Sequence, residues 1–558
     1  ISWWPPALKA CLILLMFLSS NEQLVATSYG GGRRPSLEFS APQPGRAPKM
    51  KLNNGGNAYS RPVERHLAMA QSGAFDHNGE QKNQEQREIA MTFHAEETPL
   101  TNTRAGIYEA GIPRETDQPI RLKPGPHLLL DDFLIEQSEN VERVVNKPIR
   151  DPAIPNPLVT GKEDGCFQPY MTVLRDPDTG VFRLWYGHRT ENFDTNRSRI
   201  GYLESQDGIH WKRPARILEE PRPIQFGISV IDGGKGFPNP AQRYKFGWYA
   251  EGGLNVAASP DGMVWTPLTE SIVLTHNHDI NSIFYDPLRA RYVATISVYR
   301  GGDTWSGNRR ITMQSYSSDL LTWSPPHYVL MPDSRVDEGE TQFYAMDGYL
   351  ARGDLIIGMV KVLRDDLKAD DRPDPPEAYG IGYTTLAWTR DGETWTRDPE
   401  HFFDPNSEKG TWDHAHAWID EQVVVGDEVY LYYGGYARGH KVNRFEERQI
   451  GLVKIKRDRY MAWRAGSATG KVRTPLVLLE GEAMTVNADA DSGFVQVQIL
   501  DAEGRPIPGF QRDDCEPITV DGMAAPVRWK RSIQELRDLP VRLEFSLRNA
   551  SLFSFELR

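Results

Sequence analysis

The chain has 558 residues and a formal net charge of -12 at pH 7, and 39% of its residues are hydrophobic. This length predicts two or three structural units, each with enough apolar residues for a packed core. Nucleic-acid binding requires clustered Lys and Arg, which the sequence lacks, so the composition argues against a nucleic-acid partner.

The first 26 residues have the layout of a secretory signal peptide. Lys9 precedes an apolar run from Ala10 to Phe17, which is too short to span a bilayer, and a small-residue cleavage site follows near Ala26. Residues 27–118 are rich in Gly, Asn, Gln, Pro and charge, which predicts a disordered linker. We therefore expect a secreted or periplasmic protein whose mature chain has no membrane span.

One turn with a following tryptophan recurs between residues 119 and 467. The copies SQDGIHW, SPDGMVW, SSDLLTW and TRDGETW end at Trp211, Trp265, Trp323 and Trp395, and a degenerate copy ends at Trp463. A polar turn and aromatic-rich hairpin strands precede each copy. Repeated units of four short strands are typical of a β-propeller, so we predict five blades with the tryptophans wedged between neighbouring blades. A series of β-sandwiches is the competing architecture, but it would not place one turn at this interval.

The pattern changes after residue 467. Residues 468–558 alternate apolar and polar side chains between turns, which predicts a β-sandwich. The expected fold is therefore all-β, a five-bladed β-propeller over residues 119–467 followed by a C-terminal β-sandwich.

The start of each predicted blade is unusually polar. Because the inner strands of a propeller converge on a central channel, these starts are expected to share one pocket. The residues are Glu163 and Asp164, then Asp232, then His278, Asp279 and Asn281, then Asp337, Glu338 and Glu340, and finally Trp412, Asp413, His414 and His416. Arg189 and Arg300 follow channel-proximal strands and are expected to bind anionic or hydroxyl groups.

Acids that meet in one pocket are suited to glycosidic-bond cleavage. One carboxylic acid protonates the leaving oxygen, a second carboxylate acts as nucleophile or base, and a third often stabilises the transition state. Tryptophan and histidine beside the acids would stack on a sugar ring and contact its hydroxyls. His414 and His416 share a face of their strand, but no third metal ligand is identifiable by spacing. We expect them to bind substrate, and we expect neither a metal nor a cofactor.

The five repeats, the acids at the blade starts and the trailing β-sandwich resemble the five-bladed propeller glycoside hydrolases of families 32, 43, 62 and 68. LLLDDFLIEQSENVERVVNKP, FYDPLRARYVATI and VVVGDEVYLYYGG also resemble uncharacterised secreted, family-32-like bacterial proteins. The resemblance covers Gly125 to Arg558. It implies Asp164 as nucleophile or base, Asp279 as support for the transition state and Glu340 as the acid, with Glu338 and Asp337 as close substitutes for Glu340. The family 32 nucleophile motif of Asn-Asp-Pro-Asn-Gly type is absent, so fructan specificity is not implied.

The sequence thus predicts an exported glycoside hydrolase that acts on a plant or algal poly- or oligosaccharide. A propeller lectin, with a carbohydrate pocket but no turnover, is the alternative. A glycoside phosphorylase is a third possibility, and it would need a phosphate site built from arginine and histidine.

Overall fold

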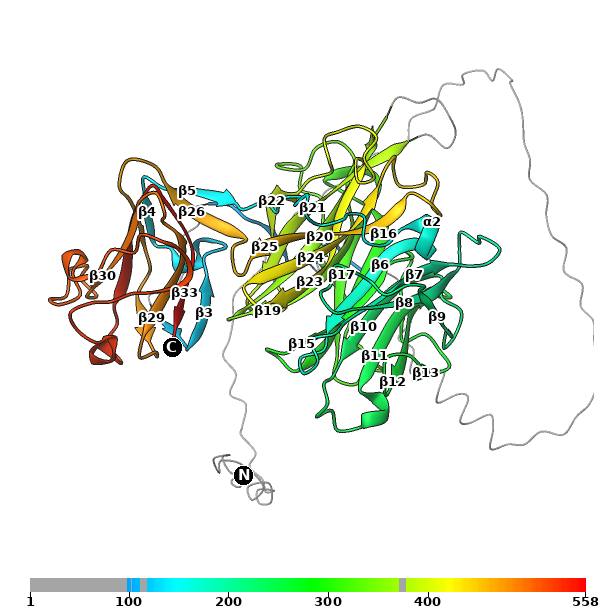
Figure 1. The fold of residues 1–558 in the computed structure, drawn as a ribbon, viewed down its shortest axis with the longest axis horizontal. Helices are drawn as coiled ribbons and strands as arrows, with labels where there is room; N and C mark the ends of the chain where they lie inside the picture. The colour runs from blue at the N-terminus through cyan, green and yellow to red at the C-terminus, as the bar shows by residue number, and fades with distance from the viewer. Residues whose placement is uncertain (1–97, 102, 111–117, 371–377) are drawn as a thin grey trace, which may run out of the picture. The chain divides into compact units, whose positions relative to one another are not determined.

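The computed structural model describes residues 98–558 except 102, 111–117 and 371–377 (Figure 1). These residues form strands almost throughout, and their one α-helix is the short α2 (Gly161–Asp164), so the all-β prediction is confirmed. No helix in the described ranges is long and apolar enough to cross a membrane. The predicted signal peptide and most of the predicted linker lie outside the described residues.

Five consecutive antiparallel units run from residue 166 to residue 456. Unit 1 comprises β6 (Cys166–Arg175), β7 (Phe182–Arg189), β8 (Ser198–Ser205) and β9 (Arg216–Leu218). Unit 2 comprises β10 (Phe226–Asp232), β11 (Tyr244–Ala250), β12 (Gly253–Ser259), β13 (Thr266–Pro267) and β14 (Leu274–Thr275). Unit 3 comprises β15 (Asn281–Asp286), β16 (Arg291–Gly302), β17 (Trp305–Ser317) and β18 (His327–Leu330).

Units 4 and 5 belong to one larger sheet, in which β21 and β23 share a single parallel bridge. Unit 4 comprises β19 (Thr341–Arg352), β20 (Leu355–Lys368), β21 (Tyr379–Thr389) and β22 (Trp395–Phe403), and unit 5 comprises β23 (His416–Val425), β24 (Glu428–Tyr436) and β25 (Arg448–Lys456). Isolated bridges from Ile149 and Val159 to β25 add an edge to unit 5 from a segment that precedes unit 1.

The first strand of each unit contacts the first strand of the next. β6 contacts β10, β10 contacts β15, β15 contacts β19, β19 contacts β23, and β23 contacts β6 again. These five inner strands therefore form a closed cycle. Residues of all five line one cavity of about 330 Å³, which we call the inner cavity.

The repeated turn makes the same hydrogen bonds in four units. In the first copy, the Ser205 hydroxyl donates to Asp207 Oδ1 at 2.9 Å and accepts from the Gly208 N–H at 2.9 Å. Asp207 Oδ1 also accepts from the N–H groups two and three residues further on, at 2.9 and 2.8 Å. The other copies repeat these bonds around Asp261, Asp319 and Asp391. The Ser and Asp side chains form hydrogen bonds with the backbone of their own turn, and this explains why the same residue types recur.

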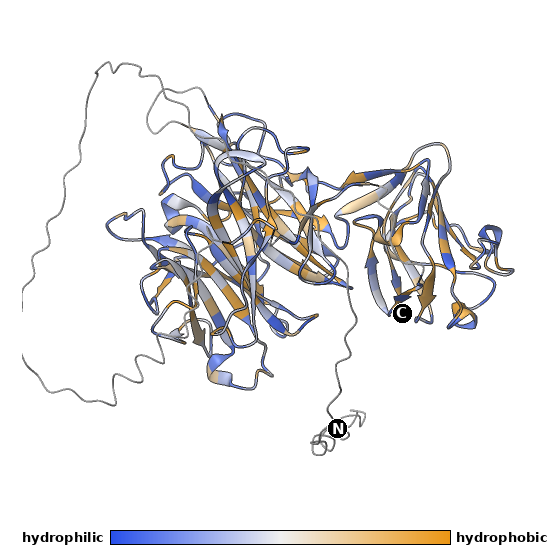
Figure 2. Ribbon diagram, turned by 180° about the vertical axis from the view of Figure 1, so that it is seen from behind, coloured by the Kyte–Doolittle hydropathy of each residue, from blue (hydrophilic) through white to orange (hydrophobic). Residues whose placement is uncertain are grey.

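The tryptophans after these turns are buried between consecutive units, as predicted. Trp265 of unit 2 packs in one cluster with Trp185 of unit 1, and Trp395 of unit 4 donates its indole N–H to Gln314 Oε1 of unit 3 at 2.8 Å. Trp211 and Trp323 also join clusters that combine two units. In Figure 2 the hydrophobic colouring is concentrated on strands, where these clusters lie. The degenerate copy differs, because Trp463 lies on a strand of a separate C-terminal sheet.

The C-terminal part contains two further sheets and a two-stranded pair. One sheet has the order β31 (Asp521–Pro526), β29 (Met484–Asp489), β33 (Ala550–Leu557), β26 (Met461–Ala465) and β5 (Glu142–Val145), with β3 (Gly125–Leu128) also on β33. The other has the order β30 (Phe494–Leu500), β32 (Arg542–Arg548), β27 (Gly470–Arg473) and β4 (Gln137–Glu139). β2 (Ile120–Leu122) pairs with β28 (Val477–Leu479). One hydrophobic cluster contains side chains of both larger sheets, including Phe555 and Phe545.

Two boundaries differ from the sequence prediction. β2, β3, β4 and β26 precede residue 468, yet they pair with strands after it, and β5 joins the same sheet through β26. An unpaired sheet edge leaves backbone groups that a neighbouring segment can satisfy. Similarly, β1 (Ala105–Ile107) lies in the predicted linker but pairs in parallel with β22. Three paired residues suffice for such an edge strand, although the surrounding composition predicts disorder.

Candidate functional site

A group of polar side chains lies where the inner strands begin. His278 and Asp279 precede β15, Arg310 is on β17, Gln342 is the second residue of β19, and Asp365 is on β20. Arg310 donates to Gln342 Oε1 at 2.7 Å and lies 3.3 Å from Asp365 Oδ2, to which Gln342 Nε2 also donates at 3.2 Å. We call these five residues the strand-start cluster.

Within this cluster, the carboxyl group of Asp279 has the least complete set of hydrogen-bond partners. His278 Nε2 lies 3.2 Å from Asp279 Oδ1 and 3.1 Å from Arg310 Nε. Burial lowers the pKa of His278 to about 3, so the ring is neutral at pH 7. Because Arg310 can only donate, Nε2 accepts from it and has no proton for Asp279. Burial also raises the pKa of Asp279, against the opposing effect of nearby arginines.

Aromatic side chains lie beside this cluster, where the Tyr344 ring contacts His278 edge-on at 6.2 Å between ring centroids. Tyr344 on β19 stacks on Trp418 of β23 at 4.7 Å between ring centroids, and its hydroxyl lies 2.8 Å from His440 Nε2. The Tyr170 hydroxyl of β6 donates to the same Tyr344 oxygen at 3.1 Å. Three inner strands thus contribute rings to one largely buried aromatic cluster, which we call the aromatic surface. Such surfaces bind ligands that have an apolar face and polar edges.

Two buried polar side chains beside this surface have no hydrogen-bond partner in the described part of the chain. They are the Gln168 amide of β6 and both ring nitrogens of His416, the first residue of β23. His416 is fully buried against Trp418 and Tyr436, and burial lowers its pKa well below the ordinary value. Most buried polar groups in folded proteins are paired, so these atoms indicate hydrogen-bonding capacity for a ligand.

Asp164 and Glu340 do not have the environments that their expected roles require. Both oxygens of Asp164 are occupied, because Arg213 donates to them at 2.8 and 3.0 Å and the Thr160 N–H donates at 3.0 Å. Asp164 is thus held in an ion pair with Arg213 through both oxygens. The Glu340 side chain is 52% exposed, and its nearest cation is Arg309 at 3.9 Å. A general acid is usually matched to its task by burial, which Glu340 lacks.

The other acids expected to bind substrate have local partners or are exposed. Asp337 pairs with buried Arg397 at 2.7 Å, and Asp232 forms two hydrogen bonds with Arg243 at 2.7 and 2.6 Å while lining the inner cavity. Asp413 is buried and accepts from Arg150 Nε at 2.7 Å and from the Tyr433 hydroxyl at 3.0 Å. The side chains of Glu163 and Glu338 are exposed, the latter by 87%.

The remaining residues that were expected to contact substrate also form contacts within the fold. Trp412 stacks on Tyr433 at 5.2 Å, and the ring nitrogens of His414 lie 2.7 and 3.0 Å from the Asn406 and Ala369 carbonyls. Arg189 donates to the Gly161 carbonyl at 2.6 Å. Arg300 donates to the Thr98 carbonyl at 2.6 Å. Of the expected residues, Asp279 and His416 lie at the starts of the inner strands with buried atoms that have no hydrogen-bond partner in the described ranges, and His278 Nδ1, Asn281 Oδ1 and Asp413 Oδ1 share this property.

The inner cavity holds a second group of acids. Lys361 is 2% exposed, lies 2.7 Å from Asp347 Oδ2 and also contacts Asp420 Oδ1. The Met171 N–H donates to the other Asp420 oxygen at 2.6 Å. Burial and the neighbouring Asp347 raise the pKa of Glu421 well above its ordinary value. This group is an ion-pair network around Lys361, beside one carboxyl group whose pKa is raised.

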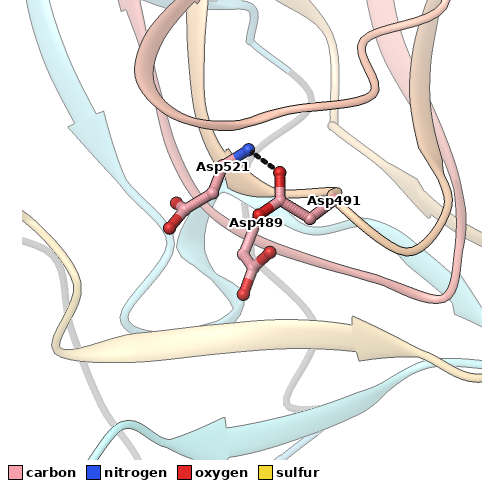
Figure 3. A group of neighbouring side chains, drawn as sticks. All are labelled: Asp489, Asp491 and Asp521. Carbon is pink, nitrogen blue, oxygen red and sulfur yellow. Dashed lines mark hydrogen bonds between the residues drawn. The ribbon is translucent and has the colours of Figure 1, made fainter.

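A third group of acids lies in the C-terminal sheets (Figure 3). Carboxylate oxygens of Asp489, Asp491 and Asp521 lie within 4.8 Å of one another. Lys456 contacts one oxygen of Asp521, Arg459 lies 2.6 Å from the other, and Asp491 accepts from the Asp521 N–H at 2.6 Å. The side chains of this chain thus already neutralise Asp521, and we assign the group no metal.

No family model and no curated protein matches this sequence. Among solved structures, a glycosyl hydrolase from Bacteroides ovatus matches with 15% identity over 57% of this chain and 95% of its own, at a TM-score of 0.39. A β-1,2-mannobiose phosphorylase from Listeria innocua matches with 14% identity over 57% and 97%, at 0.34. An exo-β-1,3-galactanase from Phanerochaete chrysosporium matches with 10% identity over 75% and 100%, at 0.35.

Proposed function

We propose that the five units form a five-bladed β-propeller and that the C-terminal sheets form a β-sandwich. The closed cycle of contacts among the inner strands supports the first part. The hydrophobic cluster that contains side chains of both C-terminal sheets supports the second. In such a propeller the strand-start cluster lies at one end of the central channel, where ligands commonly bind.

We propose that the protein is a glycoside hydrolase in which Asp279 is the general acid. The observation that carries this proposal is the Asp279 carboxyl group, which is partly buried, has a raised pKa and receives no proton from His278. A carboxyl group whose pKa is raised holds its proton to a higher pH and can transfer it to the leaving oxygen of a glycosidic bond. The aromatic surface around it suits the apolar face of a sugar ring.

Asp365 is the second carboxylate of the proposed reaction. It lies 3.3 Å from Arg310 Nη1, its side chain is 30% exposed, and it accepts from Gln342. In hydrolysis Asp365 takes a proton from water, the water oxygen bonds to the anomeric carbon, and Asp279 gives its proton to the departing oxygen. The products are two sugars with free hydroxyl groups. Gln168 and His416 would bind hydroxyls of the ring.

The test is product release by the purified full chain on a panel of neutral and acidic polysaccharides, measured by reducing ends and product mass. Asp279→Asn is expected to lower turnover by about 100- to 10,000-fold, because it removes the transferable proton and keeps the shape. Glu340→Gln is the matched control and is expected to change turnover less than twofold.

Two outcomes would contradict the hydrolase. If Glu340→Gln abolishes turnover while Asp279→Asn retains it, the acid is Glu340. If the wild-type chain binds a sugar of the panel without product, the pocket is lectin-like. Export stays part of the proposal, and the N-terminal residue of the protein recovered from the culture medium would test it.

A further inference from the structure

Two exposed aromatic side chains lie at the end of the units where the inner strands begin. Phe193 is in the loop between β7 and β8, and β7 ends beside the start of β6, because His188 pairs with Cys166. Tyr299 is on β16, three residues beyond Ile296, which pairs with the first residue of β15. Both rings therefore lie at the same end of the units as the strand-start cluster.

Tyr299 contacts the strand-start cluster directly. Its ring lies nearly parallel to the His278 imidazole, with 6.3 Å between centroids and 22° between planes, and the Arg310 guanidinium lies 5.6 Å from its centroid. The Tyr299 N–H donates to Asn277 Oδ1 at 3.0 Å, and Asn277 Nδ2 donates to the Tyr299 carbonyl at 3.1 Å. Tyr299 is nevertheless 40% exposed. Its ring thus extends the cluster to the solvent.

Phe193 is 51% exposed, and its loop holds it in an unfavourable backbone conformation. Its φ of 56° is in the left-handed region, which bulky side chains rarely adopt. The Phe193 N–H donates to the Thr190 carbonyl at 3.2 Å, and the Asp194 N–H donates to the Thr190 hydroxyl at 2.9 Å. Such a conformation persists only where the surrounding structure holds it, and it is often found at ligand-binding positions.

A series of ring contacts leads from Phe193 toward the inner strands. Phe193 meets Phe445 edge-on at 5.2 Å between ring centroids, and Phe445 stacks on Phe167 of β6 at 4.8 Å. The Arg448 guanidinium lies 5.8 Å from the Phe167 centroid and 5.0 Å from the Tyr436 centroid. The exposed ring of unit 1 is therefore supported from β6 and from both strands that flank the loop of Phe445.

The series continues through the aromatic surface to the strand-start cluster. Tyr436 contacts Trp418 at 5.6 Å between centroids, and Trp418 stacks on Tyr344, which contacts His278 edge-on. Every ring between Phe193 and Tyr299 is buried or half-buried, so only the two ends of the series are exposed. Because β10 lies between β6 and β15 in the cycle of inner strands, a ligand in contact with both ends spans more than one unit.

We infer that Phe193 and Tyr299 are outer sugar-binding positions, and that the ligand is a glycan chain longer than a disaccharide. The inference rests on the proposed function, which places the cleaved bond at Asp279. A sugar ring has an apolar face and polar edges, and an exposed aromatic ring that is already fixed in place binds such a face with little loss of conformational freedom. The contact of Tyr299 with His278 puts one outer position directly beside the cluster.

The test is calorimetric binding of cello-, xylo-, manno- and galacto-oligosaccharides, from disaccharide to hexasaccharide, to the full chain with Asp279→Asn. We expect at least one series to bind on the order of 10- to 100-fold more tightly as hexasaccharide than as disaccharide. Adding Phe193→Ala or Tyr299→Ala should each weaken hexasaccharide binding roughly tenfold and change disaccharide binding less than about twofold. Tyr299→Phe keeps the ring and should retain the gain. Tyr285→Ala is the matched control, because this exposed tyrosine lies near the other end of β15.

Two results would overturn the inference. One is affinity that does not depend on chain length, or no binding, in all four series. The other is a gain with chain length that both ring variants retain, or that Tyr285→Ala reduces equally. Turnover that depends on Asp279, together with affinity independent of chain length, would leave the hydrolase standing while this inference fails. A gain that both ring variants lose, without turnover by the wild-type chain, would support the outer positions and contradict the hydrolase.

Discussion

The inner cavity and the strand-start cluster both contain buried acids on or beside the same five strands, yet the acids differ in how they are satisfied. In the cavity, Lys361 lies between Asp347 and Asp420, and a backbone N–H completes the bonding of Asp420. In the cluster, Asp279 has no donor on one oxygen, and its neighbour His278 already accepts from Arg310. Asp347 and Asp420 are thus compensated by a cation, although the neighbouring Glu421 has a raised pKa, whereas one oxygen of Asp279 has no partner.

This difference indicates which buried acids can take part in a reaction. A buried charge with a complete set of partners contributes to the fold and has nothing left to exchange with a ligand. A buried carboxyl group without a donor holds its proton more firmly and can give it to a substrate. The hydrogen bonds and ion pairs of each acid therefore indicate the site of the reaction better than the volume of the cavity does.

The largest effect that would test this comparison is loss of the Lys361 charge. Lys361→Met is expected to lower the free energy of unfolding by about 3–5 kcal/mol, because it leaves Asp347 and Asp420 buried without their cation. Denaturant unfolding of the full chain measures this loss. Lys235→Met is the control, since Lys235 pairs with Asp178 at the exposed surface and its loss should leave the free energy of unfolding nearly unchanged. A loss of similar size in both variants would show that the cavity network is not a special stabilising feature.

The next effect is a pH dependence that arises at the start of β23. The folded-state pKa of His416 is depressed, whereas its ordinary value in an unfolded chain is about 6.5. The unfolded chain therefore binds the extra proton first, and stability is lost as the pH falls below 6.5. His416→Gln should remove about 2 kcal/mol of the stability difference between pH 7.5 and pH 5. An unchanged difference would mean that the His416 ring is charged in the folded protein.

The repeated turns could be predicted from sequence because the side chains of each turn form hydrogen bonds with backbone groups of the same turn. Ser205, Asp207 and the N–H groups that follow form one local network, so the residue types report the structure directly. The burial of Trp265 and Trp395 between units follows from the same repeat. Asp279 and His416 could also be placed near the strand starts by their position in the repeat.

The partners of the other acids could not be predicted, because they come from distant parts of the chain. Asp164 is bound by Arg213 and Asp413 by Arg150, and no spacing in the sequence relates these pairs. Gln342 and Tyr344 follow Glu340 by two and four residues, so the alternation of a strand would have indicated them once β19 was known to begin at Thr341. Arg310 and Asp365 lie on second or third strands, which a search limited to blade starts does not reach.

The smallest effect concerns the unused hydrogen-bonding capacity of Gln168. Its amide is buried without a partner, so replacing it with an apolar side chain of similar shape removes no hydrogen bond and relieves the cost of burying a polar group. Gln168→Met should therefore leave the free energy of unfolding unchanged or raise it by about 1 kcal/mol, while affinity for the bound sugar falls roughly tenfold. Gln422→Met is the contrast, because the Gln422 amide donates to the Gly348 carbonyl and accepts from Tyr460, so that variant should lose stability. If both substitutions destabilise the protein equally, Gln168 is bound by ordered water as part of the fold, and the distinction between satisfied and unsatisfied polar groups does not identify the site.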